Sequence, residues 1–207
     1  MKNLFSLIAC FLISMSLSAQ SGEWIELFNG KNFDGWKISE NPGSFSIEDG
    51  LLKVNGPRGH MFYEGAVGDH DFNNFELQVE LKTMPQANSG IFIHTEFQEK
   101  GWPNIGHEIQ VNQSHGDWRK TGSVYSFKDV KETFVKDDEW YTETIIVKGD
   151  QVTVLVNGKV INEYDESEDR EGDLGTKKLD HGTIALQAHD PNSVVYYKSV
   201  KVKILPD

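Results

Sequence analysis

The sequence predicts an all-β protein, a two-sheet jelly-roll β-sandwich, on two observations. Short runs that alternate polar with apolar residues, rich in β-branched and aromatic side chains, are separated by Gly, Asn and Asp along most of the chain. The period of an amphipathic helix is nearly absent. About ten half-buried strands in 207 residues indicate a sandwich or barrel rather than an α/β fold.

The predicted strands follow one another from the first third of the chain to its end. They cover residues 45–47, 51–54, 75–82, 90–97, 106–112, 140–148, 151–156, 159–164, 182–189 and 194–204. Asn157 and Gly158 mark a hairpin, because both central positions of a type I′ turn need a positive φ angle. The acid-rich stretch 165–180 interrupts the pattern. We expect a solvated loop there, since the stretch lacks the spaced ligands and fixed glycine of an EF-hand calcium loop.

The N-terminal segment, residues 1–20, has the pattern of a secretory signal peptide. Lys2 precedes an apolar run over residues 4–17, and small residues around Ala19 follow where cleavage is expected. The run is too short for a typical membrane span, which needs about 20 apolar residues. We therefore expect residues 21–207 to form one jelly-roll domain that works in the periplasm or outside the cell.

Charge and motif content argue against several functional classes. The formal net charge is −12, which disfavours nucleic acids and anionic membranes, because both are bound through clustered Lys and Arg. No P-loop, dinucleotide fingerprint, serine nucleophile elbow or HExxH zinc motif occurs, so no nucleotide cofactor is expected. The one cysteine, Cys10, lies in the predicted signal peptide, so packing alone must hold the domain together. Neutral ligands remain, carbohydrate prominent among them.

Polar side chains share one face on each of three predicted strands, by the two-residue strand period. They are Glu108, Gln110 and Asn112 in strand 106–112, His94 in strand 90–97, and Gln187 and His189 in strand 182–189. A lone histidine on a strand is more often structural than catalytic. If the three faces line one sheet, however, they build a concave site with one carboxylate, two imidazoles and several amides, which suits sugar hydroxyls.

Three aromatic residues strengthen the carbohydrate hypothesis. Trp102, Trp118 and Tyr125 lie in the loop-rich segment around the strand of Glu108. Sugar rings present apolar C–H faces that stack on such side chains. An ordinary glycosidase would carry two carboxylates at even spacing on this strand, whereas Glu108 is followed by amides, which cannot serve as nucleophile or acid.

Seven segments, in order along the chain, carry a family resemblance. They are residues 26–36 (ELFNGKNFDGW), 74–77 (NFEL), 88–93 (NSGIFI), 108–111 (EIQV), 121–125 (TGSVY), 156–158 (VNG) and 182–189 (GTIALQAH). On these motifs the chain resembles the 3-keto-disaccharide hydrolase domain family, formerly described only as a domain of unknown function. The resemblance spans nearly all of residues 21–207. It implies a concanavalin-like jelly-roll that cleaves disaccharides or glycosides already oxidised at C3.

The family's motif residues fall on Glu108, Gln110, Gln187 and His189. The chain departs from the family pattern where Arg is usual and His94 stands, and at residues 196–198, where Tyr-Tyr-Lys replaces Phe-Arg-Asn. A C3 ketone acidifies the C2 proton, so a base can remove it and the C1 substituent leaves before water adds. The resemblance thus implies an acid/base pair of Glu108 with His94 or His189, with Gln110 and Gln187 as hydrogen-bond donors.

Three alternatives stay open from the sequence. A bound divalent metal could stabilise the enolate in place of the amides. The missing second carboxylate is compatible with a non-catalytic carbohydrate-binding module. An ordinary glycoside hydrolase of jelly-roll type would need a second carboxylate about 5–10 Å from Glu108.

Overall fold

The computed structural model describes residues 22–169 and 177–206. The predicted signal peptide, residues 1–20, lies outside this part of the chain, so its cleavage stays a prediction. Within the described part, none of the helices has the length and apolar character needed to cross a membrane.

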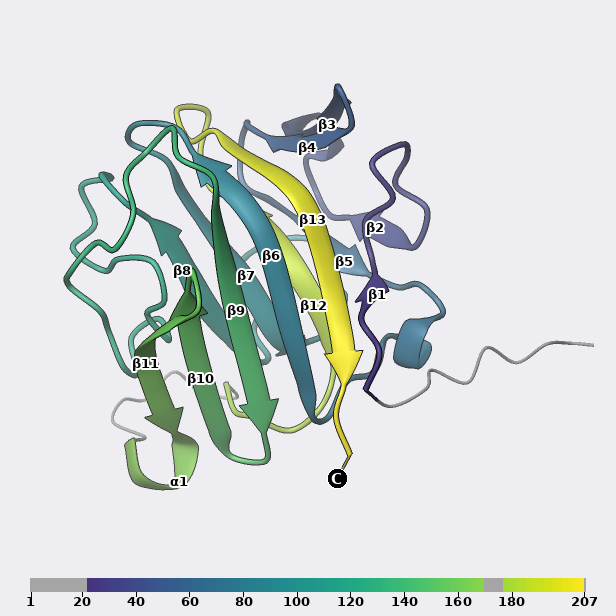
Figure 1. Ribbon diagram of the computed structural model, residues 1–207. Helices are drawn as coiled ribbons and strands as arrows, with labels where there is room; N and C mark the ends of the chain where they lie inside the picture. The colour runs from purple at the N-terminus through teal and green to yellow at the C-terminus, as the bar shows by residue number, and fades with distance from the viewer. Residues whose placement is uncertain (1–21, 170–176, 207) are drawn as a thin grey trace, which may run out of the picture.

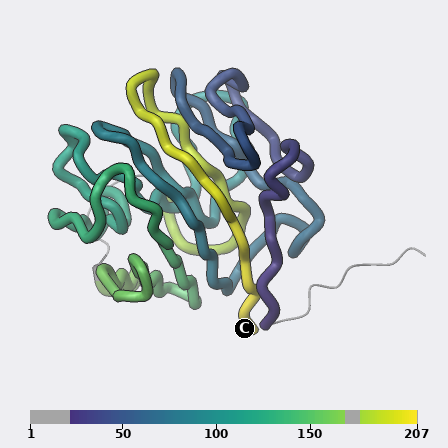
Figure 2. The backbone as a smooth tube through the Cα atoms, turned by 45° about the horizontal axis from the view of Figure 1, so that its top comes forward, coloured from purple at the N-terminus to yellow at the C-terminus, as the bar shows by residue number. Residues whose placement is uncertain are grey.

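Two antiparallel sheets pack face to face, which confirms the predicted jelly-roll sandwich (Figures 1 and 2). The larger sheet has the order β11-β10-β9-β6-β13-β4-β3, with β1 on β13. Its strands are β1 (Ile25–Glu26), β3 (Phe45–Glu48), β4 (Leu51–Val54), β6 (Phe75–Thr83), β9 (Tyr141–Lys148), β10 (Gln151–Val156), β11 (Lys159–Asp165) and β13 (Val195–Ile204).

The smaller sheet lies behind the larger one in the view of Figure 1 and has the order β2-β5-β12-β7-β8. Its strands are β2 (Trp36–Ile38), β5 (Gly59–Tyr63), β7 (Asn88–Thr95), β8 (His107–Asn112) and β12 (Thr183–Ala188). The helical segments of the described residues are short turns, namely η1 (Pro42–Ser44), η2 (Val67–His70) and α1 (Glu166–Asp169).

Strand alternation places the core between the sheets. In β6, for example, Phe75, Leu77 and Val79 are fully buried, and the residues between them are partly exposed. The hairpin predicted at Asn157 and Gly158 is confirmed, because it joins β10 to β11 with φ angles of 49° and 78° at these two residues.

Two expectations about chain segments need correction. The sequence analysis does not predict the strands β1, β2 and β5. In β5, whose sequence is GHMFY, all five residues are buried, so the burial does not follow the alternating pattern that predicts a half-buried strand. The stretch 165–180 is not uniformly solvated. Glu166 contacts His107 Nε2 at 3.0 Å and accepts the N–H of Leu179, which is buried. Both described ends of this stretch therefore pack against the sandwich.

Candidate active site

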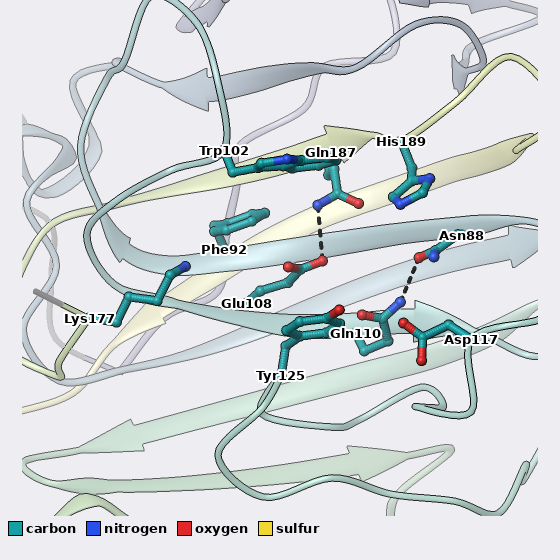
Figure 3. Close-up of a pocket in the computed structure, with 10 residues that line it drawn as sticks. All are labelled: Asn88, Phe92, Trp102, Glu108, Gln110, Asp117, Tyr125, Lys177, Gln187 and His189. Carbon is teal, nitrogen blue, oxygen red and sulfur yellow. Dashed lines mark hydrogen bonds between the residues drawn. The ribbon is translucent and has the colours of Figure 1, made fainter. Parts of the chain in front are cut away.

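A cavity lies on the face of the smaller sheet that points away from the larger sheet. In β8, Ile109 and Val111 are fully buried between the sheets, so Glu108 and Gln110 project from the opposite face. The cavity has a volume of about 260 Å³ (Figure 3). Its walls are formed by Asn88, Phe92, Trp102, Glu108, Gln110, Asp117, Tyr125, Lys177, Gln187 and His189.

Three neighbouring strands bring these side chains together. In the sheet order β12-β7-β8, Phe92 of β7 pairs with Glu108 on one side and with Ala185 of β12 on the other. Gln187 follows Ala185 at even spacing and shares its face. The strands of Glu108 and Gln187 are not adjacent, yet both side chains line one cavity.

Gly90 of β7 makes the contact across the sheet possible. A Cβ atom at this position would lie 2.3 Å from Glu108 Oε1, so any side chain there would displace the carboxylate. With hydrogen in its place, Glu108 lies over β7 and its Oε1 accepts the Gln187 Nε2–H at 3.0 Å. Figure 3 shows this hydrogen bond at the centre of the cavity.

The environment of Glu108 changes its acidity. Burial raises the pKa of Glu108 to about 7, and the nearby Asp117 charge acts in the same direction. The hydrogen bond from Gln187 and the positive charge of Lys177 oppose this rise. Burial also lowers the pKa of Lys177, although the Glu108 charge raises it. Near neutral pH, Glu108 therefore exists in both protonation states and can exchange protons with a ligand.

The two glutamines of the cavity keep unused hydrogen-bonding capacity. Gln110 Nε2 donates to Asn88 Oδ1 at 2.6 Å, and Gln187 Nε2 donates to Glu108. The Oε1 atom of each glutamine is buried and has no hydrogen-bond partner within the described residues. A buried acceptor without a partner costs free energy, which a ligand hydroxyl can recover by donating to it.

His189 lies at the cavity wall just beyond the end of β12. Its Nδ1 is 2.8 Å from Asp190 Oδ2. The imidazole contacts two aromatic rings, with centroid distances of 5.6 Å to Trp102 and 5.8 Å to His115. These contacts hold the ring in a defined orientation at the cavity.

Trp102 and Tyr125 supply aromatic surface on either side of Glu108 (Figure 3). Trp102 is 43% exposed and has the Arg58 guanidinium 5.1 Å from its ring centroid. Among the residues predicted from sequence, the cavity thus gathers Glu108, His189, Gln110, Gln187, Trp102 and Tyr125.

His94 does not line the cavity, so its predicted place there is wrong. The register between β7 and β12 shifts between Thr183 and Ala185, where β7 carries one extra residue. His94 has a φ angle of 51° in this bulge, and the strand alternation reverses there. Its buried imidazole packs against Phe75 of the larger sheet, with 5.6 Å between ring centroids.

Both ring nitrogens of His94 are already engaged. Nδ1 accepts the backbone N–H of Asp180 at 3.1 Å, so Nε2 carries the proton and donates to the carbonyl of Asn73 at 2.9 Å. Burial lowers the pKa of His94, which favours this neutral form. The residue joins two loops to the end of β7.

Asn112 and Trp118 also lie outside the cavity wall. Asn112 is buried, and its Nδ2 donates to the carbonyls of Asp117 and Arg119 at 3.0 and 2.7 Å. It therefore shapes the loop that carries Asp117. Trp118 is 49% exposed and lies beside the Arg119 guanidinium, at 4.6 Å.

Four cavity residues were not among the predicted site residues. They are Asn88, Phe92, Asp117 and Lys177. Asn88 and Phe92 stand at even spacing from Gly90, a signal that strand periodicity could have provided. Lys177 comes from the acid-rich stretch, and no local pattern indicates that it reaches the cavity.

The composition of the cavity does not suggest a metal centre. Across residues 22–169 and 177–206, no three His, Cys, Asp or Glu side chains are grouped so that they could hold a metal ion. The polar groups of the cavity instead form a set of acids, amides and one imidazole, which is suited to sugar hydroxyls and proton transfer.

Comparison with known proteins identifies the family of the chain. A model of the 3-keto-alpha-glucoside-1,2-lyase-like domain matches residues 23–203. A 3-keto-disaccharide hydrolase of Bacteroides thetaiotaomicron is 39% identical over 94 residues, which span 42% of this chain and 32% of that protein. The chain thus matches about a third of that relative's length.

Solved structures share the fold. A candidate glycosyl hydrolase of Parabacteroides distasonis has a TM-score of 0.73 and 26% identity, covering 88% of this chain and 94% of that one. A carbohydrate-binding module of Bacillus subtilis has a TM-score of 0.56 and 9% identity, covering 82% and 95%, and is similar in fold alone. Because the family model extends over nearly all described residues, the chain belongs to the 3-keto-alpha-glucoside-1,2-lyase-like domain family.

Proposed function

We propose that this protein cleaves glycosides whose sugar carries a ketone at C3, by eliminating the C1 substituent and then adding water. The observation that carries the proposal is Glu108, a carboxyl with a pKa of about 7 beside unpartnered amide oxygens in a sugar-sized cavity. The family name describes a 1,2-lyase acting on 3-keto-glucosides, and the Bacteroides relative is named for 3-keto-disaccharides.

The reaction needs three kinds of group. A base removes the C2 proton, and the C–H electron pair forms an enolate with the C3 oxygen. As the ketone re-forms, a C1–C2 double bond is made and the C1–O bond breaks, and an acid protonates the departing oxygen. Water then adds at C1 and a proton returns to C2, which gives the free 3-keto sugar.

Cavity residues are available for each role. Glu108 and His189 are the acid/base pair, since His94 is engaged elsewhere. The second amide hydrogens of Gln110 and Gln187 and the ammonium of Lys177 are the donors for the enolate oxygen. Trp102 and Tyr125 provide surfaces for the apolar faces of the sugar rings.

One observation favours a second candidate, ordinary glycoside hydrolysis. Asp117 lines the same cavity as Glu108, so a second carboxylate is present although it comes from a loop rather than from β8. Two carboxylates on either side of a glycosidic bond are the usual requirement of that mechanism. This candidate predicts cleavage of glycosides that carry no ketone.

The test uses purified protein with the nitrophenyl glycoside of 3-keto-glucose and with its unoxidised parent. We expect nitrophenol release from the keto substrate only, in both anomeric series or in one. Release from the parent glucoside would favour ordinary hydrolysis. Tight binding of unoxidised oligosaccharide without any release would indicate a carbohydrate-binding module and contradict the proposal.

We further infer that the protein acts after export across the inner membrane, in the periplasm or outside the cell. The support is the sequence of residues 1–20, which has the features of a cleaved signal peptide. Cell fractionation and N-terminal sequencing of the native protein test this inference. A start at Met1 in the cytoplasmic fraction would contradict it.

A further inference from the structure

We propose that His189, oriented by Asp190, removes the C2 proton and that Glu108 protonates the departing oxygen. This inference rests on the proposed function and assigns the order of proton transfers within it. Asp190 does not line the cavity and acts through His189, so it is a positioning residue.

The hydrogen bonds around Asp190 favour its ionised form. Its Oδ2 accepts hydrogen bonds from His189 Nδ1 at 2.8 Å and from the Ser193 hydroxyl at 2.7 Å, and its Oδ1 accepts the Asn192 N–H at 2.8 Å. Burial raises the pKa of Asp190, but the hydrogen bonds from Ser193 and His189 outweigh it and lower the pKa to about 2.

An ionised carboxylate fixes the tautomer of its histidine partner. Because Asp190 can only accept, Nδ1 of His189 must carry a proton, and the lone pair of the neutral ring is then on Nε2. The neighbouring rings of Trp102 and His115 restrict rotation of the imidazole. Nε2 is therefore the basic atom of a ring held at the cavity wall, and Asp190 stabilises the imidazolium that forms.

The surroundings of Glu108, by contrast, favour its neutral, protonated form. No hydrogen bond joins its carboxyl to an ionised side chain within residues 22–169 and 177–206, and the partner at Oε1 is the neutral amide of Gln187 at 3.0 Å. The amide N–H occupies Oε1, so the proton of the neutral acid belongs on Oε2, from which it can be donated to a ligand oxygen. His189 contacts an ionised carboxylate, whereas Glu108 contacts a neutral amide. Such a contrast between two titratable groups of one cavity is the basis for assigning one as base and the other as acid.

The proton balance closes over one cycle. His189 takes the C2 proton and Glu108 gives its proton to the departing oxygen, so the elimination leaves an imidazolium and a carboxylate. In the hydration step, Glu108 takes a proton from the water that adds at C1, and His189 returns its proton to C2. Other titratable groups that line the cavity are Asp117, Tyr125 and Lys177, and His115, His60 and Arg58 lie beside its rings.

The experiment separates the base from the acid with an analogue of 3-keto-glucose that has hydrogen in place of the C1 substituent. In deuterium oxide, exchange of its C2 proton needs the base but no acid for a leaving group, and proton NMR measures it. We expect Glu108→Gln to retain exchange within a few-fold. The same variant should lose methanol release from the methyl glycoside of 3-keto-glucose by about 100-fold or more, because methoxide, unlike nitrophenolate, is a poor leaving group that needs an acid. His189→Gln and Asp190→Asn should lose both by about 100-fold.

The reverse pattern, exchange lost in Glu108→Gln and kept in His189→Gln, would overturn the assignment. A wild-type protein that neither exchanges C2 nor releases nitrophenol would count against the proposed function itself. The matched control is Asp71→Asn, because Asp71 pairs with His181 at 2.6 Å in a second Asp–His contact outside the cavity. Both activities should be unchanged in this variant.

A second measurement does not depend on activity. Nitrogen-15 NMR of the wild-type protein should show the neutral His189 protonated on Nδ1, and Asp190→Asn should shift the ring toward the other tautomer. A wild-type His189 protonated on Nε2 would overturn the role of Asp190, whether or not the variants fold.

Discussion

Two glutamates, the half-buried Glu108 and the fully buried Glu143, differ in what surrounds them. Burial raises the pKa of both carboxyls, to about 7 for Glu108 and well above the ordinary value for Glu143. Glu108 faces the cavity on the smaller sheet and accepts a hydrogen bond from Gln187. Glu143 of β9 is fully buried, and neither of its oxygens has a hydrogen-bond partner within the described residues.

The orientation of each strand explains the difference. Glu143 stands two residues from Tyr141 and two residues from Ile145, which are both buried in the core between the sheets. It therefore shares their inward face. Glu108 is adjacent to the core residue Ile109, so it points to the opposite face and away from the core. A raised pKa alone therefore does not identify a catalytic group. A cavity and polar groups directed into it are also needed.

The largest expected effect compares Glu108→Gln with Glu143→Gln in the release of methanol from the methyl glycoside of 3-keto-glucose, whose leaving group must be protonated. Glu108→Gln should lower kcat by about 100- to 10,000-fold, because it removes a general acid. Glu143→Gln should leave kcat within a few-fold of wild type, since Glu143 does not line the cavity of Glu108. Equal loss in both variants would refute the distinction between the two glutamates.

Gly90→Ala tests whether Glu108 must lie over β7. The added Cβ would be 2.3 Å from Glu108 Oε1, so the carboxyl must move away from Gln187. A displacement of about 1 Å in a catalytic group can cost about 100-fold in rate, and we expect a loss of 10- to 100-fold in kcat/KM. Gly43→Ala is the matched control, because a Cβ there meets no atom within 4 Å. Full activity of Gly90→Ala would show that this placement of Glu108 is not required.

Much of this arrangement follows from strand periodicity. The alternation of β8 indicates which face carries Glu108 and Gln110, and the same argument places Gln187 on β12. The sequence could not indicate the bulge at His94, because a bulge depends on the register with a strand about ninety residues away along the chain. One extra residue was enough to turn His94 from the predicted face to the core.

The remaining cavity residues depend on contacts that are distant along the chain. Lys177 reaches the cavity from a stretch whose composition indicates a solvated loop, and its place is defined only once that stretch packs against the sandwich. Asp117 is held by a loop that Asn112 organises through backbone carbonyls. Local patterns predict strands and faces, whereas the loops that complete a site are fixed by tertiary packing.

Stability as a function of pH should sharpen the description of Glu143. Its pKa is raised in the folded state, so the unfolded chain releases this proton first and stability falls as pH rises above about 4.5 toward the folded value. Glu143→Gln removes this penalty, which is about 1.4 kcal/mol for each unit of pKa difference. Urea unfolding should show the variant gaining stability over wild type at about pH 8 and little at about pH 4. The same difference at both values would contradict a neutral, buried Glu143.

The smallest expected effect distinguishes two exposed tryptophans, Trp102 and Trp118, which are 43% and 49% exposed. Only Trp102 lines the cavity, where it contacts His189. Trp102→Ala should raise KM for the keto substrate by about 3- to 10-fold, since aromatic contacts contribute about 0.5–1.5 kcal/mol beyond area burial. Trp118→Ala should leave KM unchanged, because its ring lies beside Arg119 outside the cavity wall. If both variants bind substrate equally well, the sugar does not stack on the Trp102 wall. The binding surface must then be sought on the opposite side of Glu108, at Tyr125.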